Sequence, residues 1–286
     1  MSRLQKLKYN NVIGEYRVLV KYDLDAKGTG HVFKRKELIE SKSSEFQKIE
    51  ISDLDILGRV LVLDNIIQLS ELDSSRYHES FAHIPTSNIK NPKKALIMGG
   101  GDGILAHELL KYPGLEIDLV DIDKEVCELS KKHLTKLGSL SMDNPRVRVH
   151  NMDALEFCNN SMKSGVVYDC IFADITDPHR ESPSKSLLGD EALGVYSAIL
   201  HDDGLFISQT DNIQIAPEHR EQVGNSLSKV FNNVGNFGIV ALTLSSMFSF
   251  VWGSKNNNIS LSPVTVETSW LNDRRYRFCL EFDEVT

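Results

Sequence analysis

Several features that mark other protein classes are scarce in this 286-residue sequence. The four cysteines are widely separated and form no Cys-x-x-Cys pair: Cys127, Cys158, Cys170 and Cys279. We therefore expect buried free thiols in a reducing cytoplasm, and no zinc site, because zinc sites use closely spaced cysteines. The nine histidines show no His-x-His or His-x-x-x-His spacing, and we predict no metal centre.

Long apolar runs and an excess of basic charge are also missing. No segment approaches the roughly 18 uninterrupted apolar residues of a membrane span, and residues 1–6 carry no apolar leader. We expect a cytoplasmic protein with no secretory signal and no membrane partner. The 40 acidic residues outnumber the 32 basic ones, for a net charge of −8. This balance argues against a nucleic-acid partner and is compatible with a small cationic substrate.

The first 75 residues are rich in strand signals without intervening helices. Alternating or apolar segments occur at 16–22, 46–51 and 58–69, and Asp64-Asn65 inside the last one is a hairpin signal. We predict a small antiparallel β domain over residues 1–75.

The pattern changes at Ser74, where a helix is expected that ends at Pro85. Short apolar strands and helical segments then alternate, which predicts an α/β fold with a doubly wound, mostly parallel sheet over residues 76–286. The expected strands are 95–98, 116–121, 146–150, 168–173 and 204–209, followed by an antiparallel edge at 238–244 and 248–254. The expected helices are 104–111, 124–137, one from Asp153, 188–200 and 217–231.

The run Gly99-Gly-Gly-Asp102-Gly103 after the first of these strands is the strongest functional signal. Glycine turns of this kind bring backbone close to a nucleotide, and Asp121 follows about 20 residues later, where an acid binds ribose. A nicotinamide cofactor would place its pyrophosphate beside Asp102, which repels it, whereas a sulfonium or ammonium is attracted. The turn therefore favours S-adenosylmethionine or its decarboxylated form, and does not distinguish the two.

Acids also follow the other parallel strands, at the edge where such sheets bind ligands. Asp153 follows the third strand, and for this residue a helix N-cap is as good an explanation as ligand binding. Asp174 and Asp177 follow the fourth strand, three residues apart and ahead of Pro178. Paired carboxylates suit a diamine, and one of them can accept a proton from an attacking ammonium.

Taken together, these motifs resemble those of the polyamine aminopropyltransferases, the family of spermidine and spermine synthases. The matching blocks are Phe46-Gln47, Leu63 through Tyr77-His78-Glu79, Gly99–Gly103 with Asp121-Ile-Asp123, and Asp174-Ile-Thr-Asp177-Pro178. The resemblance implies an N-terminal β domain and a Rossmann-like catalytic domain. It also implies transfer of an aminopropyl group from the co-substrate decarboxylated S-adenosylmethionine to putrescine or spermidine, with methylthioadenosine released. From the resemblance we also expect a homodimer.

The resemblance also implies roles for individual residues. Asp174 would remove the proton from the amine, and Tyr77 and Asp177 would hold the amine. Met247 stands where spermidine synthases carry a tyrosine that touches putrescine. The residues expected to contact the co-substrate are Gln47, His78, Gly99, Gly101, Asp102, Asp121, Asp153 and Ala154.

The sequence departs from the family pattern at two of the co-substrate contacts and around the amine pocket. Asp121 replaces a glutamate, Ala154 replaces a glycine, and the segment after Pro178 lacks the family's Gly-Pro loop and its tyrosines. The acceptor amine therefore stays open. Two alternatives also stay open: a small-molecule methyltransferase that uses S-adenosylmethionine, and a catalytically silent binding protein on the same fold.

Overall fold

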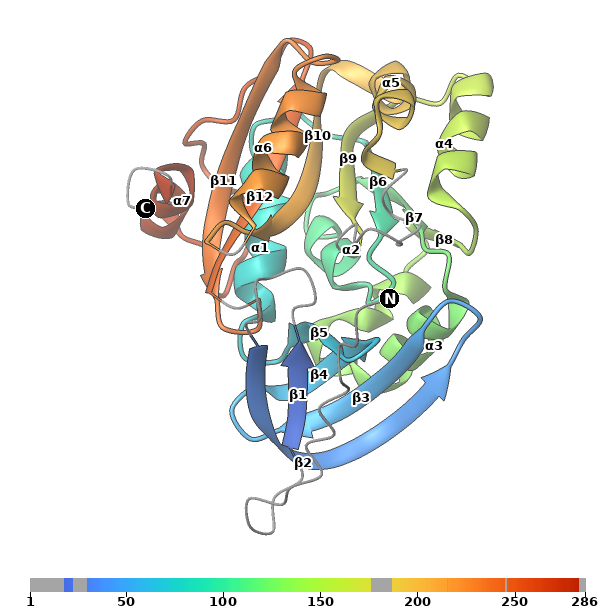
Figure 1. Cartoon of the computed structure of the whole chain (residues 1–286). Coiled ribbons are helices and arrows are strands. Elements are labelled where there is room, and N and C mark those ends of the chain that lie inside the picture. The colour runs from blue at the N-terminus through green and yellow to red at the C-terminus, as the bar shows by residue number, and fades with distance from the viewer. Residues whose placement is uncertain (1–17, 23–29, 176–186, 215, 245, 283–286) are drawn as a thin grey trace, which may run out of the picture.

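The first of two sheets in the computed structural model is built from the N-terminal part of the chain (Figure 1). The structure describes residues 18–22, 30–175, 187–214, 216–244 and 246–282. Five antiparallel strands follow one another in chain order: β1 (Val18–Tyr22), β2 (Gly30–Ser43), β3 (Lys48–Leu54), β4 (Gly58–Leu63) and β5 (Ile66–Ser70). The small antiparallel sheet expected from the sequence is confirmed.

The turn between β4 and β5 explains why Asp64-Asn65 signals a hairpin. Both residues have positive φ, 47° and 69°, which a two-residue hairpin turn requires and which Asp and Asn tolerate. Strand β2, in contrast, was not expected. Most of its described side chains are polar and exposed or half-buried, so it carries no apolar alternation to detect.

The second sheet has seven strands in the order β11-β12-β10-β9-β6-β7-β8. Strands β10, β9, β6, β7 and β8 are parallel, and β12 runs antiparallel to both β10 and β11. The doubly wound sheet with an antiparallel edge is therefore confirmed. The bounds are β6 (Lys94–Gly99), β7 (Glu116–Val120), β8 (Val147–His150), β9 (Tyr168–Asp174), β10 (Leu200–Asn212), β11 (Asn233–Ala241) and β12 (Ser246–Ser254).

Helices cover both faces of this sheet, which is why its strands are continuous apolar runs. One face packs against α1 (Ser74–Thr86), α2 (Ile104–Leu109) and α7 (Asp273–Leu280) through buried side chains such as Phe81, Leu105 and Tyr276. The other face packs against α4 (Ala154–Lys163), α5 (Asp190–Ile199) and α6 (Pro217–Leu227). Helix α7 was not expected from the sequence. Among the described residues, no helix is long and apolar enough to span a membrane.

The N-terminal sheet packs against α3 (Lys124–His133) and the start of α2. The shared apolar cluster combines Ile49, Leu61 and Leu63 with Ile104 and Val126, among other side chains. In Figure 1 this blue sheet lies below the seven-stranded sheet, on the side toward which β9 points. It therefore borders the carboxyl ends of the parallel strands. The domain boundary at residue 75 stays a prediction from the sequence.

Candidate active site

The register of the parallel strands brings several predicted site residues to one edge of the sheet. Gly99, the last residue of β6, pairs with Asp174, the last residue of β9. Asp121 follows the end of β7 directly, and Asp102 lies in the turn after β6. Carboxyl ends of adjacent parallel strands open into the same crevice, so this alignment concentrates acids at one place.

The turn after β6 needs glycine because neighbouring atoms lie too close to leave room for a Cβ. Gly99 has a φ of 81°, and a Cβ at this position would lie 2.1 Å from the carbonyl oxygen of Asp174. A Cβ on Gly101 would lie 2.5 Å from Asp121 Oδ2, which accepts a hydrogen bond from the Gly101 N–H at 2.9 Å. The glycines therefore let the turn sit directly against two of the acids.

Tyr77 and Asp174 are in direct contact. The Tyr77 hydroxyl donates a hydrogen bond to Asp174 Oδ1 at 2.8 Å. The Tyr77 ring is held by two buried aromatic side chains, with centroid distances of 5.6 Å to Phe81 and 5.2 Å to Phe250. Helix α1 and strand β12 thus fix the hydroxyl in place, because packed aromatic rings have little freedom to move.

His78 lies beside Asp102 and is only 2% exposed. Its Nδ1 donates to the Ser74 carbonyl oxygen at 2.8 Å, and because a carbonyl can only accept, this bond fixes the ring. Nε2 then faces Asp102 Oδ1 at 3.8 Å. Asp102 Oδ1 also accepts a hydrogen bond from the Ile104 N–H at 2.7 Å, at the start of α2.

The electrostatics of this edge favour a positively charged ligand. Burial raises the pKa of Asp174 to about 7, and the nearby Asp102 carboxylate adds to the effect. Burial also raises the pKa of Asp121 to about 6, opposed by its backbone hydrogen bonds and reinforced by Asp123 and Asp102. A bound cation would offset this repulsion between carboxylates.

The donor atoms of His78, Asp102 and Asp174 all lie within 4.8 Å of one another. Such a group can hold either a metal ion or an organic cation. An ammonium or sulfonium needs no fixed coordination geometry, so the arrangement suits the charged groups of the expected substrates as it stands.

Three predicted co-substrate contacts lie further along the edge. Asp153 Oδ1 caps α4 by accepting from the Glu156 N–H at 2.8 Å, and the residue is otherwise exposed. The neighbouring Ala154 is buried in the first turn of that helix. Gln47, in the turn between β2 and β3, donates from Nε2 to Asp123 Oδ2 at 3.0 Å. The N-terminal sheet therefore contributes a side chain to this edge.

The remaining predicted amine contacts are Met247 and Asp177. Met247 lies near the start of strand β12, just ahead of the expected strand at 248–254, and pairs with Val240. Asp177 lies outside the described residues. A narrow pocket runs beside Tyr77 and His78, between the end of β5, the start of α1 and the turn after β11.

Two buried acids beside the site received no individual role in the sequence analysis, although both fall in the matching blocks. Asp123 is 1% exposed and binds Gln47. Glu79, also 1% exposed, accepts hydrogen bonds from the backbone N–H groups of Ser269, Trp270 and Leu271. It ties α1 to the segment before α7. The position of Glu79 directly after Tyr77-His78 could have drawn attention to it in the sequence. Its hydrogen-bond partners lie about 190 residues away and could not have been deduced.

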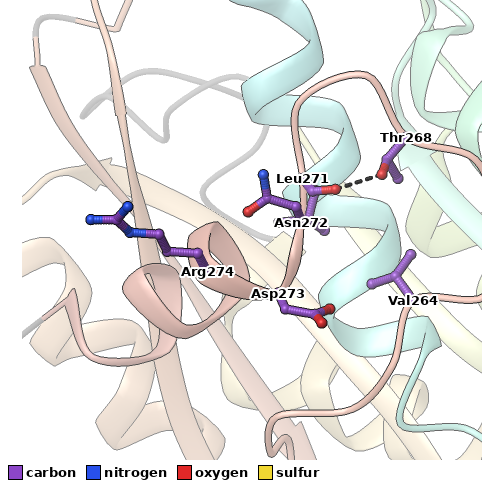
Figure 2. Close-up of a pocket in the computed structure, with 6 residues that line it drawn as sticks. All are labelled: Val264, Thr268, Leu271, Asn272, Asp273 and Arg274. Carbon is purple, nitrogen blue, oxygen red and sulfur yellow. Dashed lines mark hydrogen bonds between the residues drawn. The ribbon is translucent and has the colours of Figure 1, made fainter.

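A second hollow lies at the start of α7, on the outer flank of the molecule (Figures 1 and 2). Figure 2 shows Asp273 and Arg274 beside it, with the Thr268 hydroxyl bonded to the Leu271 carbonyl oxygen. Its lining includes none of the clustered carboxylates or glycines described above. The acid-lined sheet edge is therefore the candidate active site.

The family assignment follows from comparison with known proteins. Residues 74–263 match the model of the spermine/spermidine synthase domain, and residues 21–71 match that of the spermidine synthase tetramerisation domain. The chain belongs to the spermine/spermidine synthase family. This confirms the resemblance inferred from the sequence motifs.

Curated relatives and solved structures agree with the assignment. The chain is 36% identical to a polyamine aminopropyltransferase of Clostridium tetani, over 81% of this chain and 82% of that one. It is 34% identical to a polyamine aminopropyltransferase of Pyrobaculum aerophilum, over 84% and 83% of the two chains. The fold matches a spermidine synthase solved with the transition-state analogue AdoDATO, with a TM-score of 0.83, 26% identity and coverage of 93% and 92%. The Thermotoga maritima spermidine synthase matches with a TM-score of 0.82, 26% identity and coverage of 93% and 91%.

Proposed function

We propose that this protein is a polyamine aminopropyltransferase. It transfers the aminopropyl group of decarboxylated S-adenosylmethionine to a di- or triamine and releases methylthioadenosine. The observation that carries the proposal is the hydrogen bond between Tyr77 and Asp174 at an edge where Asp102 and His78 also converge. This arrangement joins a candidate proton acceptor to a cation-binding cluster, and family membership supports the reaction class.

The proposed chemistry is an in-line displacement. The amine nitrogen attacks the aminopropyl carbon bonded to sulfur, and the carbon–sulfur bond breaks with its electron pair remaining on sulfur. The sulfonium becomes a neutral thioether, so the leaving group needs little assistance. The attacking amine must first lose the proton of its ammonium form, because that proton occupies the lone pair. Catalysis therefore consists of positioning and deprotonation.

Asp174 is the proposed proton acceptor. Its pKa of about 7, raised by burial and by Asp102, lies close to physiological pH and suits a general base. The Tyr77 hydroxyl orients the carboxylate, and Asp177 and Met247 complete the amine site in this proposal. Two positive substrates entering an acidic crevice also gain from its negative potential before they react.

The co-substrate is proposed to lie along the remaining edge. Asp102 and His78 face its charged aminopropyl end, while Asp121 binds the ribose hydroxyls beside the turn of Gly99 and Gly101. Gln47, Asp153 and Ala154 line the adenosine side. No permanently bound cofactor is required, since the reaction involves neither electron transfer nor a metal-activated water.

A product assay tests the proposal. The protein is incubated with decarboxylated S-adenosylmethionine and, separately, putrescine and spermidine, and products are identified by mass spectrometry. Methylthioadenosine formed in proportion to an aminopropylated amine is expected. Methyl transfer from S-adenosylmethionine, together with tighter calorimetric binding of that form than of the decarboxylated one, would instead identify a methyltransferase. Binding without any transfer would identify a silent binding protein.

We also propose that the protein acts in the cytoplasm as a homodimer or a larger homo-oligomer. The match of residues 21–71 to a tetramerisation domain supports self-association. The four cysteines are free and buried, which suits a reducing compartment. Light scattering coupled to size-exclusion chromatography measures the mass, and a monomer at micromolar concentration would contradict the assembly.

A further inference from the structure

Asp123 is a buried carboxylate that connects the two walls of the co-substrate crevice. Its Oδ2 accepts hydrogen bonds from Ser44 Oγ at 2.7 Å and from Gln47 Nε2 at 3.0 Å, both in the N-terminal part of the chain. Its Oδ1 caps α3 by accepting from the Glu125 N–H at 3.1 Å. Its own N–H donates to Asp121 Oδ1 at 2.8 Å. Asp123 thus contacts two residues that are proposed to bind the co-substrate, Gln47 and Asp121.

The turn that carries Gln47 is closed on itself. The Ser44 N–H donates to the Gln47 carbonyl oxygen at 3.0 Å, and the Gln47 N–H donates to Ser44 Oγ at 3.1 Å. The nearby ion pair of Lys42 with Glu125 is 46% exposed at the lysine, and an exposed pair of this kind contributes little. The buried carboxylate of Asp123 is therefore the main polar attachment of this turn to the catalytic domain.

The chemistry of the contact also sets the direction of the Gln47 side-chain amide. A buried carboxylate accepts hydrogen bonds and donates none, so the Gln47 NH₂ group must face Asp123. The amide oxygen Oε1 is then directed away from that contact. Among the described residues, no hydrogen bond to Oε1 occurs, so it is available to accept one from a ligand hydroxyl or amine.

We propose that Asp123 is a positioning residue that holds Gln47 with its carbonyl oxygen presented to the co-substrate. The inference rests on the proposed function, because it concerns the adenosine side of that site. Asp123 does not touch the ligand in this proposal. It acts through Gln47, and through its backbone N–H it also braces the Asp121 carboxylate.

The variant Asp123→Asn changes this contact selectively. Asparagine can still cap a helix, as Asn272 does for α7 by accepting from the Arg275 N–H at 3.0 Å. Its NH₂ group, however, would face the NH₂ group of Gln47, and two donors cannot bond. Gln47 must either leave or rotate its amide, and rotation presents a donor to the co-substrate in place of an acceptor.

Calorimetric titration and steady-state kinetics test the proposal. Loss of one hydrogen bond changes an equilibrium constant by roughly 3- to 10-fold. For Asp123→Asn we expect Kd and KM of decarboxylated S-adenosylmethionine to rise by about this factor. The KM for the amine and the kcat at saturating co-substrate should stay within about twofold, since neither depends on Gln47. The cap-removal control Asn272→Ala should lower the Tm without changing the Kd.

Introducing Asp123→Asn into the Gln47→Met variant tests whether Asp123 acts by positioning Gln47 or has only a structural role. Gln47→Met alone should weaken co-substrate binding as Asp123→Asn does, and the double variant should be no weaker than either single one. Equal binding by Asp123→Asn and wild type, or full additivity in the double variant, overturns the proposal. If Asp123→Asn does not fold, the Gln47→Met variant decides the matter by itself: normal co-substrate binding by Gln47→Met would overturn the proposal. Co-substrate binding by wild type without aminopropyl transfer contradicts the proposed function and leaves this inference standing.

Discussion

Replacing Asp174 by asparagine should remove activity and, at the same time, stabilise the protein at alkaline pH. The variant keeps an oxygen that can accept the Tyr77 hydrogen bond, and the backbone contact from the Gly100 N–H to the residue 174 carbonyl at 3.2 Å is unchanged. It loses only the proton acceptor. General base catalysis contributes about 10²- to 10⁴-fold to a rate, so kcat should fall by this factor.

The stability effect follows from the direction of the pKa shift. The pKa of Asp174 is raised by burial and by Asp102 from 3.8 to about 7 in the folded protein. Between these values the unfolded chain is ionised while the folded protein retains the proton, so stability falls as pH rises from about 4 to 7. Above pH 7 the full penalty is present, on the order of 2–4 kcal/mol for a half-buried group. A neutral asparagine avoids this penalty.

Two assays check the prediction. The first follows methylthioadenosine release by chromatography from pH 5.5 to 9, where the wild-type kcat/KM should fall on the acid side with a pKa near 7. The second measures the Tm of both proteins from pH 4.5 to 8.5. The asparagine variant should melt several degrees higher at pH 8, and the gain should disappear toward pH 4.5. A kcat within tenfold of wild type, or a Tm gain independent of pH, would refute the assigned role or the assigned environment of this carboxylate.

Three further predictions concern the turn, the tyrosine and a buried acid outside the site. In Tyr77→Phe, loss of the hydrogen bond that lowers the Asp174 pKa should move the acid limb of the rate profile to higher pH, and an unmoved limb would contradict the contact. Gly101→Ala places a Cβ 2.5 Å from a carboxylate oxygen and should abolish co-substrate binding in calorimetry, whereas Gly194→Ala, whose Cβ meets nothing within 4 Å, should bind normally. Burial of Glu108 is outweighed by hydrogen bonds from a histidine and a lysine, and its pKa falls to about 2. The ionised Glu108 carboxylate therefore stabilises the fold above pH 4.5, and this stabilisation is lost as pH falls toward 2. Urea titration should show Glu108→Gln less stable than wild type at pH 7 by on the order of 3 kcal/mol, with a smaller difference in the free energy of unfolding near pH 3.

Local signals in the sequence determined the family, the class of fold and the position of the crevice. The apolar strands, the glycine turn and the acids after each strand are short-range patterns, and parallel strand pairing is enough to bring Asp102, Asp121 and Asp174 to one edge. The hairpin at Asp64-Asn65 was equally visible, because its backbone conformation restricts the residues that fit.

Tertiary structure alone decided the contacts that join distant segments. Strand β2 has little apolar alternation, and helix α7 is short and rich in charged residues, so both form through pairing and packing with other elements. The bond from Tyr77 to Asp174 spans 97 positions and that from Gln47 to Asp123 spans 76, so no local pattern specifies either. The pKa of Asp174 depends on burial and on a neighbouring charge, both of which exist only once the chain has folded. The sequence thus determined which chemical groups are present at the crevice, while the folded structure decided which of them touch and which carry a proton.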